Sequence, residues 1–347
     1  MRALVLSEYK HLDVTEIAAP QVSAGEVLVQ VAACGICGSD VHGYDGASGR
    51  RIPPIVMGHE AAGTIAALGS GVEGFSVGDR VVFDSTVYCG LCPFCLRGEV
   101  NLCDDRQVVG VSCAEYSRAG AFAEYVAVPA RILYKLPESL SFPEAAMLEA
   151  VAVALHAVRV AELSGGESAL VIGAGMIGLL LLQAARASGC SPIYVADIDP
   201  TRLRLARDLG ADEALQLSGA ELAAAILQRT GGVDIVFEAV GRAETVASAI
   251  DCVRKGGTVT LVGNIAREVP IPLQRVVTRQ IRLQGSCASA GEYPLAMELI
   301  ANGKIKVLPL ITAVAPLSEG ALWFDRLYRH EPHLMKVVLD PRGSVSA

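Results

Sequence analysis

The fold of this chain is decided by the stretch Leu170-Val-Ile-Gly173-Ala-Gly175-Met176-Ile177-Gly178-Leu179. It is a G-x-G-x-x-G motif that follows an apolar, strand-like run and opens an apolar, helix-like one. Gly173 permits a tight turn, Gly175 lets the backbone approach a pyrophosphate, and Gly178 lets the helix pack on the strand. The helix N-terminus, at Met176 and Ile177, is then free to receive phosphate. The motif predicts a dinucleotide site; the alternative is a glycine-containing turn that binds nothing.

A carboxylate at the end of the next predicted strand indicates which dinucleotide binds. The segment Tyr194-Val-Ala-Asp197 places Asp197 where it can hydrogen-bond the two ribose hydroxyls of NAD. The same carboxylate would repel the 2′-phosphate of NADP, although Arg202 lies close enough in sequence to soften that repulsion. NAD is therefore the predicted cofactor, with Asp197 and Arg202 among its contacts.

The pattern of apolar runs, glycines and prolines on either side of this motif predicts two domains. Apolar runs separated by helical stretches are typical of parallel strands covered by helices on both faces, and they lie at Ala169–Gly173, Ile193–Ala196, Val233–Glu238 and Thr258–Val262. Before about Phe142, short alternating segments broken by glycine and proline predict an irregular, mostly antiparallel β region. A last strand is expected at Met335–Leu339. We predict an α/β protein with a doubly wound nucleotide-binding domain at 153–288 and a second domain formed by 1–152 and 289–347.

Length and composition narrow the function classes. A chain of 347 residues fits two cores better than one. Its net charge of −8, without a basic run, disfavours nucleic acid as a partner. There is no signal-peptide pattern and no apolar run of membrane-spanning length, so a cytoplasmic protein without a membrane partner is expected. Ten cysteines in such a chain favour metal or redox chemistry over disulfides.

Four of the cysteines share one short segment, Cys89-x-x-Cys92-x-x-Cys95-x7-Cys103. This spacing lets a single loop fold around a tetrahedral Zn²⁺ ion. An all-thiolate site is closed to water and substrate, so we predict a structural zinc that stabilises a loop poor in hydrophobic residues. The alternative is a surface loop of four reduced cysteines, which would be prone to oxidation.

A second set of candidate ligands is spread over the first domain, at Cys37, His59, Glu60 and Glu149. One thiolate, one imidazole and one or two carboxylates make an under-coordinated set, as expected of a catalytic zinc that keeps a position open for substrate. Whether Glu60, Glu149 or both bind the metal is left open. Cys34 and Cys37 also form a C-x-x-C pair, but no thioredoxin-like βαβ unit surrounds them.

Several motifs occur in a fixed order along nearly the whole chain: Cys37-Gly-Ser-Asp-x-His42, Gly58-His-Glu-x-x-Gly63-x5-Gly69-x-x-Val72, Val77-Gly-Asp-Arg-Val81, the four-cysteine loop and the glycine-rich turn. Together they resemble the zinc-containing medium-chain alcohol dehydrogenases. Glu60 and Glu149 make the chain look like the polyol branch of that family, which includes sorbitol (L-iditol) and galactitol-1-phosphate dehydrogenases. Two positions depart from the family pattern: Ala150 replaces proline, and Ala121 replaces glycine.

The resemblance implies a GroES-like first domain, a Rossmann second domain, two zinc ions per subunit, NAD and a homodimer or homotetramer. Zinc bound to a substrate hydroxyl would lower its pKa, so that hydride can pass to the nicotinamide. Ser39 is expected to accept the proton and relay it through the cofactor ribose to His42. The alternative for His42 is an ordinary surface histidine. A polyol-like small molecule is the expected substrate.

Two groups of competing functions remain open. Within the same family, the substrate could be L-threonine, a butanediol or a simple alcohol. Outside enzymes, the chain could be a catalytically silent NAD-binding structural or regulatory protein, or a zinc-binding interaction module. The side chains that line the substrate pocket are not identified by any motif; Tyr44, Phe122 and Arg279 are the candidates considered.

Overall fold

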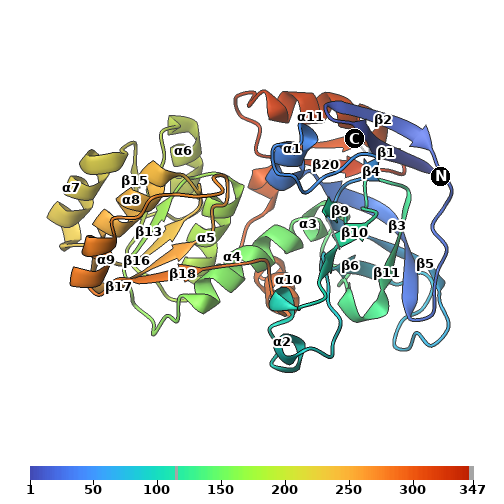
Figure 1. The fold of residues 1–347 in the computed structure, drawn as a ribbon, viewed down its shortest axis with the longest axis horizontal. Helices are drawn as coiled ribbons and strands as arrows, with labels where there is room; N and C mark the ends of the chain where they lie inside the picture. The colour runs from blue at the N-terminus through green and yellow to red at the C-terminus, as the bar shows by residue number, and fades with distance from the viewer. Residues whose placement is uncertain (114–115, 344–347) are drawn as a thin grey trace. The chain divides into compact units, whose positions relative to one another are not determined.

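The protein forms two compact units in a computed structural model that describes residues 1–113 and 116–343 (Figure 1). Unit 1 comprises Met1–Glu149, Ser289–Ala301 and Val307–Ala347, and unit 2 comprises Ala150–Ala288 and Asn302–Lys306. The chain therefore leaves unit 1, builds unit 2 and returns. The domain limits 153–288 and 289–347 stay a prediction; the compact units themselves change at Glu149/Ala150 and at Ala288/Ser289.

Unit 1 is built on a seven-stranded sheet with the order β12-β6-β5-β3-β20-β19, to which β11 adds by pairing with β3. The strands of this sheet are β3 (Glu26–Gly35), β5 (Glu60–Leu68), β6 (Arg80–Phe83), β11 (Tyr125–Pro129), β12 (Leu133–Lys135), β19 (Ile311–Pro316) and β20 (Lys336–Asp340). Most pairs are antiparallel, whereas β19 and β20 are parallel. The last strand therefore lies against β3, the strand that leads to Cys37.

Smaller elements surround this sheet. The remaining strands are β1 (Arg2–Glu8), β2 (His11–Glu16), β4 (Ile55–Val56), β7 (Thr86–Val87), β8 (Gln107–Val108), β9 (Val111–Cys113) and β10 (Tyr116–Arg118). The helices are α1 (Gly38–Tyr44), α2 (Pro93–Leu96), α3 (Phe142–Ala145), α10 (Tyr293–Ala301) and α11 (Gly320–Tyr328), while α4 (Leu148–Val160) begins in unit 1 and continues into unit 2. The core includes Phe122 and Phe324, fully buried rings that meet edge to face.

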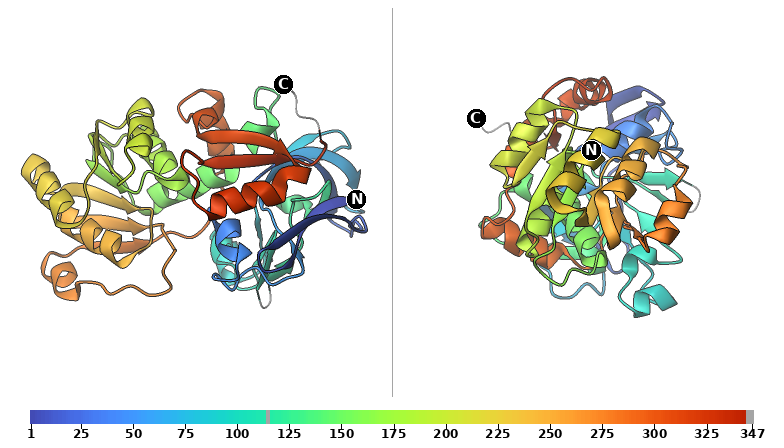
Figure 2. Two further views of the ribbon diagram at one scale, coloured as in Figure 1. Left: turned by 90° about the horizontal axis from the view of Figure 1, so that it is seen from above. Right: turned by 90° about the vertical axis from the view of Figure 1, so that its left-hand side faces the viewer.

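Unit 2 is a six-stranded parallel sheet with the order β15-β14-β13-β16-β17-β18. Its strands are β13 (Ala169–Ile172), β14 (Ile193–Ala196), β15 (Glu213–Leu215), β16 (Val233–Glu238), β17 (Val253–Leu261) and β18 (Arg282–Gly285). Helices α5 (Met176–Ala187), α6 (Pro200–Asp208), α7 (Gly219–Thr230), α8 (Ala243–Cys252) and α9 (Leu273–Thr278) accompany the strands (Figure 2). The strand order reverses between β13 and β16, which is where such sheets bind nucleotides. The predicted fold class is confirmed.

One buried amide links the short segment Asn302–Lys306 to the rest of unit 2. Gln183 on α5 accepts a hydrogen bond from Lys306 N (2.7 Å) and donates one to Lys306 O (3.3 Å). A buried amide needs such partners, since leaving them unmade costs about 1–3 kcal/mol. The pair fixes this return segment to α5.

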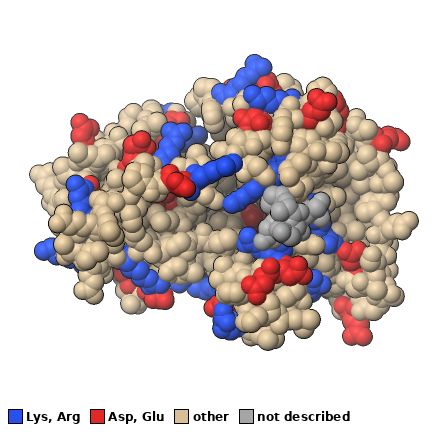
Figure 3. Space-filling view, in the orientation of Figure 1, with Lys and Arg blue, Asp and Glu red and all other residues tan. Residues whose placement is uncertain are grey.

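Two surface properties bear on partners. Every helix among the described residues is too short or too polar to cross a lipid bilayer. On the face shown in Figure 3, Lys and Arg side chains are interspersed with Asp and Glu.

Candidate metal centres and nucleotide site

The four cysteines of the predicted structural site come together. Their Sγ atoms all lie within 4.8 Å of one another, with Cys92 and Cys95 sulfurs 3.5 Å apart. The loop turns its backbone N–H groups toward these sulfurs: Cys89 N donates to Cys103 Sγ at 3.3 Å, and Cys92 N donates to Cys89 Sγ at 3.3 Å. N–H donors stabilise thiolates rather than thiols. The donor set and its geometry fit Zn²⁺.

The same loop has little hydrophobic packing of its own. Leu91 and Leu96 are 82% and 75% exposed, and α2 has no buried residue. Such a segment cannot hold its conformation through burial of apolar surface. A metal bound by all four sulfurs would supply the missing stabilisation.

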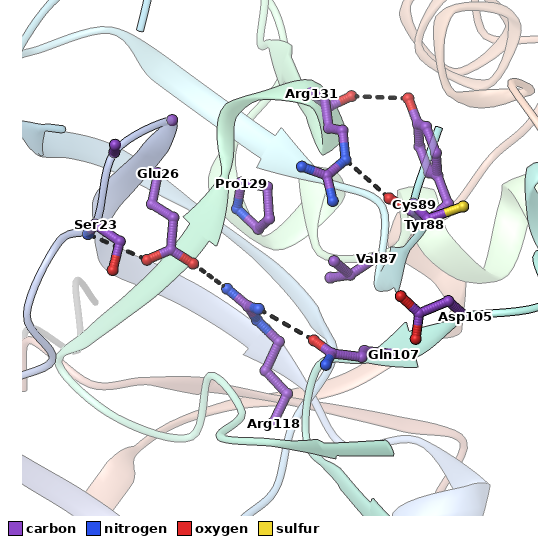
Figure 4. A pocket seen from close by; sticks show the side chains of 12 residues that line it. Ser23, Glu26, Val87, Tyr88, Cys89, Asp105, Gln107, Arg118, Pro129 and Arg131 are labelled. Atoms are coloured by element: carbon purple, nitrogen blue, oxygen red, sulfur yellow. Dashed lines mark hydrogen bonds and ion pairs between the residues drawn. The ribbon is translucent and has the colours of Figure 1, made fainter. Parts of the chain in front are cut away.

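A hollow of about 370 Å³ lies beside the loop (Figure 4). Its polar side chains pair with one another: Arg131 donates to Tyr88 O (2.9 Å), and Arg118 donates to Glu26 (2.5 Å) and Gln107 (3.3 Å). These bonds tie the start of the loop to the strands behind it. The hollow is therefore explained as part of the loop's anchorage.

Three of the four candidate ligands of the mixed set come together. Ligand atoms of Cys37, His59 and Glu60 lie within 4.8 Å of one another. Cys37 is the N-cap of α1, His59 follows the turn at Gly58, and Glu60 begins β5. Gly58 has a φ of +93°, and a Cβ there would lie 2.8 Å from the Phe122 ring, so only glycine fits. The turn thereby aims two consecutive side chains at Cys37.

Glu60 is held by a lysine that comes from the other end of the chain. Lys336, at the start of β20, donates to Glu60 Oε2 at 2.5 Å and to Ile36 O at 3.2 Å, and both side chains are almost completely buried. Burial alone would lower the pKa of Lys336, but the charge of Glu60 outweighs it and raises that pKa. Gly35 makes room for the pair, because a Cβ there would lie 2.3 Å from Glu60 Oε2.

His59 is oriented by a buried carboxylate. Its Nδ1 lies 3.4 Å from Asp40 Oδ1, which leaves Nε2 as the ring nitrogen for a metal. Burial lowers the pKa of His59, but the negative charges of Asp40 and Cys37 outweigh it and raise that pKa well above its ordinary value. The surroundings of His59 thus stabilise positive charge, which fits a cation bound between the three ligands.

Glu149 stays outside this three-residue set. It lies in the first turn of α4, and burial raises its pKa to about 7, with His59 opposing that rise and Glu60 adding to it. The charges of His59 and Glu60 therefore act on the Glu149 carboxyl group, although Glu149 is not grouped with the three close ligand atoms. Direct ligation by Glu149 remains a prediction.

Ser39 and His42 lie on α1, three residues apart and exposed, hence on neighbouring positions of the helix surface. The three candidate pocket residues all make contacts within the protein. Tyr44 donates its hydroxyl to Lys10 O (2.7 Å), Phe122 is fully buried, and Arg279 in unit 2 donates to Ile250 O (2.9 Å).

In unit 2, the glycine-rich turn connects β13 to α5. Gly173 has a φ of +97°, and a Cβ on Gly178 would lie 1.7 Å from Gly173 O. A Cβ on Gly175 would meet nothing within 4 Å, so the backbone there is open to a ligand. Asp197 Oδ2 accepts a hydrogen bond from Ala174 N in the same turn (2.6 Å). The predicted carboxylate therefore lies beside the predicted phosphate-binding turn.

Arg202 is placed one turn into α6. Its guanidinium lies 3.7 Å from Asp199, the N-cap of that helix, and is partly exposed. Asp199 N also donates to Asp197 Oδ1 at 2.9 Å. Asp199 therefore contacts both Arg202 and Asp197.

A parallel nucleotide-binding sheet joined to a unit that carries a mixed metal-ligand set defines an oxidoreductase. Residues 23–138 match the alcohol dehydrogenase GroES-like domain, and residues 177–302 match the zinc-binding dehydrogenase domain. The chain belongs to the family of zinc-binding alcohol dehydrogenases, and it is an enzyme that acts on CH–OH groups.

Named relatives cover almost the whole chain. Sorbitol dehydrogenase of Bacillus subtilis is 33% identical, over 98% of this chain and 97% of its own. L-Idonate 5-dehydrogenase of Vitis vinifera is 35% identical, over 87% and 84%. The crystal structure of galactitol-1-phosphate dehydrogenase from Escherichia coli superposes with a TM-score of 0.90 at 28% identity, over 98% and 100%. The predicted family and its polyol branch are confirmed.

Three residues of the site were missed by sequence reasoning: Asp40, Arg51 and Lys336. Asp40 stands inside the Cys37–His42 motif, and its position at N3 of α1 was the available signal. Arg51 and Lys336 belong to no motif, and only the tertiary structure brings them to the site.

Proposed function

We propose that this dehydrogenase oxidises a secondary hydroxyl group of a polyol or polyol phosphate, with NAD as hydride acceptor. The observation that carries the proposal is the ligand set of Cys37, His59 and Glu60, in which a carboxylate directly follows the histidine. The sorbitol, idonate and galactitol phosphate dehydrogenases among its relatives support the same substrate class.

The metal chemistry follows from the residues present. Cys37, His59 and Glu60 would hold a catalytic zinc, while Cys89, Cys92, Cys95 and Cys103 would hold a structural one. Bound zinc supplies a Lewis acid that lowers the pKa of the substrate hydroxyl and stabilises its alkoxide. The three-residue set would leave room for that hydroxyl as a further ligand, whereas the four cysteines would leave none.

The nucleotide is assigned to the turn in unit 2. Gly173, Gly175 and Gly178 with the N-terminus of α5 would hold the pyrophosphate, and Asp197 would accept hydrogen bonds from the ribose hydroxyls. NAD supplies the two-electron acceptor for the substrate carbon. The negative charge of Asp197 favours NAD over NADP.

The proton leaves through side chains of α1. Ser39 Oγ accepts the proton of the substrate hydroxyl, and the exposed His42 releases a proton to solvent. His42 lies in the last turn of α1, three residues beyond Ser39.

A substrate screen tests the proposal. NAD reduction is measured with polyols, polyol phosphates, L-threonine, butanediols and simple alcohols, and the zinc content of the same sample is determined. The expected result is the highest kcat/KM for a polyol or its phosphate, with zinc bound. Preference for L-threonine, a butanediol or a primary alcohol would contradict the substrate class. Absence of turnover with every alcohol would support a silent nucleotide-binding protein instead.

We further propose that the chain forms a homodimer or homotetramer in the cytoplasm. The sheet of unit 2 ends at β18, whose outer edge has no neighbour among the described residues, and Leu273 and Val277 on nearby α9 are 64% and 67% exposed. The five cysteines of the two candidate zinc sites form no disulfide bond, as both sites require and as a reducing compartment favours. Light scattering at working concentration tests the oligomer; a monomer would contradict it.

A further inference from the structure

Arg51 is a buried cation in the loop between α1 and β4. Only 2% of its surface is exposed. Its Nη2 donates to Asp40 Oδ1 (2.9 Å) and to Ser39 Oγ (3.3 Å), its Nε donates to Asp40 Oδ1 (3.2 Å), and its Nη1 donates to Arg50 O (3.3 Å). One guanidinium therefore contacts both the carboxylate that orients His59 and the hydroxyl proposed to accept the substrate proton.

Helix α1 makes room for this side chain. A Cβ at Gly43 would lie 2.3 Å from Arg51 Cγ and 3.0 Å from its Cβ. Glycine within a helix costs about 1 kcal/mol relative to alanine. The glycine is thus explained by the path of the arginine across the helix.

Stability alone is a weak reason for such an arrangement. Burial of a charged pair costs several kcal/mol per ion, which the attraction between Arg51 and Asp40 offsets only in part. Hydrophobic residues of similar volume often stabilise a core as well as a buried pair does. The contact of Arg51 with Ser39 therefore points to a role in the chemistry at that hydroxyl.

The contact restricts what the Ser39 hydroxyl can do. Arginine carries only donors, so Ser39 Oγ must accept from Arg51. The single hydrogen of the hydroxyl is then directed away from Arg51, while a second lone pair stays available. A hydroxyl in this state can accept a proton from one side as it donates its own to the other.

We propose that Arg51 is a positioning residue for proton transfer, fixing the Ser39 hydroxyl as a relay. The inference rests on the proposed function. As the substrate C–H bond releases hydride to the nicotinamide, the alcohol O–H bond breaks and its proton passes to Ser39 Oγ. The hydrogen of Ser39 leaves in the direction of His42. Ser39 ends with one hydrogen, as it began, so it carries no net charge through the step.

The test compares Arg51→Lys and Arg51→Met with Arg50→Met, a matched control whose side chain is exposed. Lysine keeps the charge but lacks the fork that reaches Asp40 and Ser39 together. We expect kcat to fall about 10-fold for lysine and about 100-fold for methionine, the range seen when residues behind a metal site or a proton relay are lost. The solvent deuterium isotope effect on kcat should rise in both, with KM, zinc content and the Arg50→Met enzyme unchanged.

A double variant separates this role from a structural one. If Arg51 acts through Ser39, Arg51→Lys should cause no further loss of kcat in a Ser39→Ala background. Additive losses would overturn the inference. So would a lysine variant with wild-type kcat and isotope effect, or one that cannot fold, because Arg51 would then be a structural residue only. Failure of the proposed function is a different result: the wild-type enzyme itself would oxidise no alcohol.

Discussion

The two candidate metal sites are built in opposite ways. The four-cysteine site comes from one loop of fifteen positions, Cys89 to Cys103, and its sulfurs are held mainly by backbone N–H groups of the same loop. The mixed site takes Cys37 and His59 from separate elements, and two of its ligands contact buried charged side chains: His59 lies beside Asp40, and Glu60 pairs with Lys336.

This difference separates two functions of a bound metal. A local, closed set of identical ligands can stabilise a loop, but it offers no position to a substrate. A dispersed set with buried charged neighbours is expensive to assemble, and those neighbours tune the ligands and leave one position open. The comparison makes five predictions, in decreasing order of expected effect.

Loss of a mixed-site ligand should remove catalysis. His59→Ala is expected to lower kcat by about 10³-fold or more, because the Lewis acid is lost from the reaction. NADH binding, measured by fluorescence titration, should stay within about threefold, since unit 2 carries the nucleotide residues. Cys37→Ser should behave in the same way. Substantial turnover by either variant would place the catalytic metal elsewhere.

Loss of Lys336 should destabilise the zinc-free protein. Lys336→Met leaves Glu60 buried and unpaired, which costs about 3–5 kcal/mol in urea unfolding of chelator-treated enzyme. Zinc should recover part of that loss. Lys135→Met is the matched control, because Lys135 is exposed and its pair with Asp79 lies at the surface, where an ion pair contributes little to stability. Equal losses in the two variants would show that the burial of Glu60 is unimportant.

Loss of a loop cysteine should affect folding more than chemistry. Cys92→Ser is expected to reduce zinc from two ions per chain to one and to cost a few kcal/mol, below the roughly 10–16 kcal/mol of isolated zinc-finger peptides. Calorimetry and elemental analysis measure the two effects. The exposed Cys287, replaced by serine, serves as control. Wild-type melting with one zinc would argue against a structural metal.

The charge of Asp197 should set the cofactor preference. Asp197→Ala is expected to shift the kcat/KM ratio of NADP to NAD upward by roughly 10–100-fold, about 1.4–2.8 kcal/mol. Asp197→Asn controls for the hydrogen bond from Ala174 N, because it keeps an acceptor and removes the charge. An unchanged ratio in both variants would identify another residue as the discriminator.

The smallest expected effect concerns Asp84, on the segment that leads into the four-cysteine loop. Burial raises the pKa of Asp84 to about 6, above the value near 3.9 of an unfolded chain. The native state therefore holds more protons between these values, and stability falls as pH rises from about 4 to 6. Asp84→Asn, which can keep its bonds to Thr86 and Ser289, should gain about 1–2 kcal/mol at pH 7 and nothing near pH 3.5.

Equal gains at both pH values would mean that Asp84 acts through packing instead of charge. Urea unfolding of wild type and variant at the two pH values makes the measurement. The measurement therefore tests whether the charge of a buried carboxylate outside the mixed site, that of Asp84, also affects stability.

The sequence was informative where function depends on local spacing. The four cysteines and the glycine-rich turn are each contained in a short segment, so their chemistry could be predicted without tertiary structure. The mixed set needed the family resemblance, because Cys37 and His59 are separated by α1 and a loop. Even then, the sequence left Glu60 and Glu149 as alternatives; in the structure Glu60 lies with Cys37 and His59, and ligation by Glu149 stays a prediction.

Residues that support the ligands could not be predicted, for a physical reason. Lys336 reaches Glu60 through the pairing of β20 with β3, and Arg51 reaches Asp40 through a loop that crosses α1 at Gly43. Neither contact leaves a periodicity or a spacing in the sequence. The residues that line the substrate pocket could not be predicted for the same reason. Of the candidates, Tyr44 and Phe122 pack within unit 1.

The ion pair between Glu60 and Lys336 spans 276 positions of the chain. At the usual pace of translation, about 5–20 residues per second, Glu60 leaves the ribosome tens of seconds before its partner. All of unit 2 emerges in that interval. The strand that completes the sheet behind the mixed metal site arrives afterwards, so this site is among the last parts of the newborn protein to take shape.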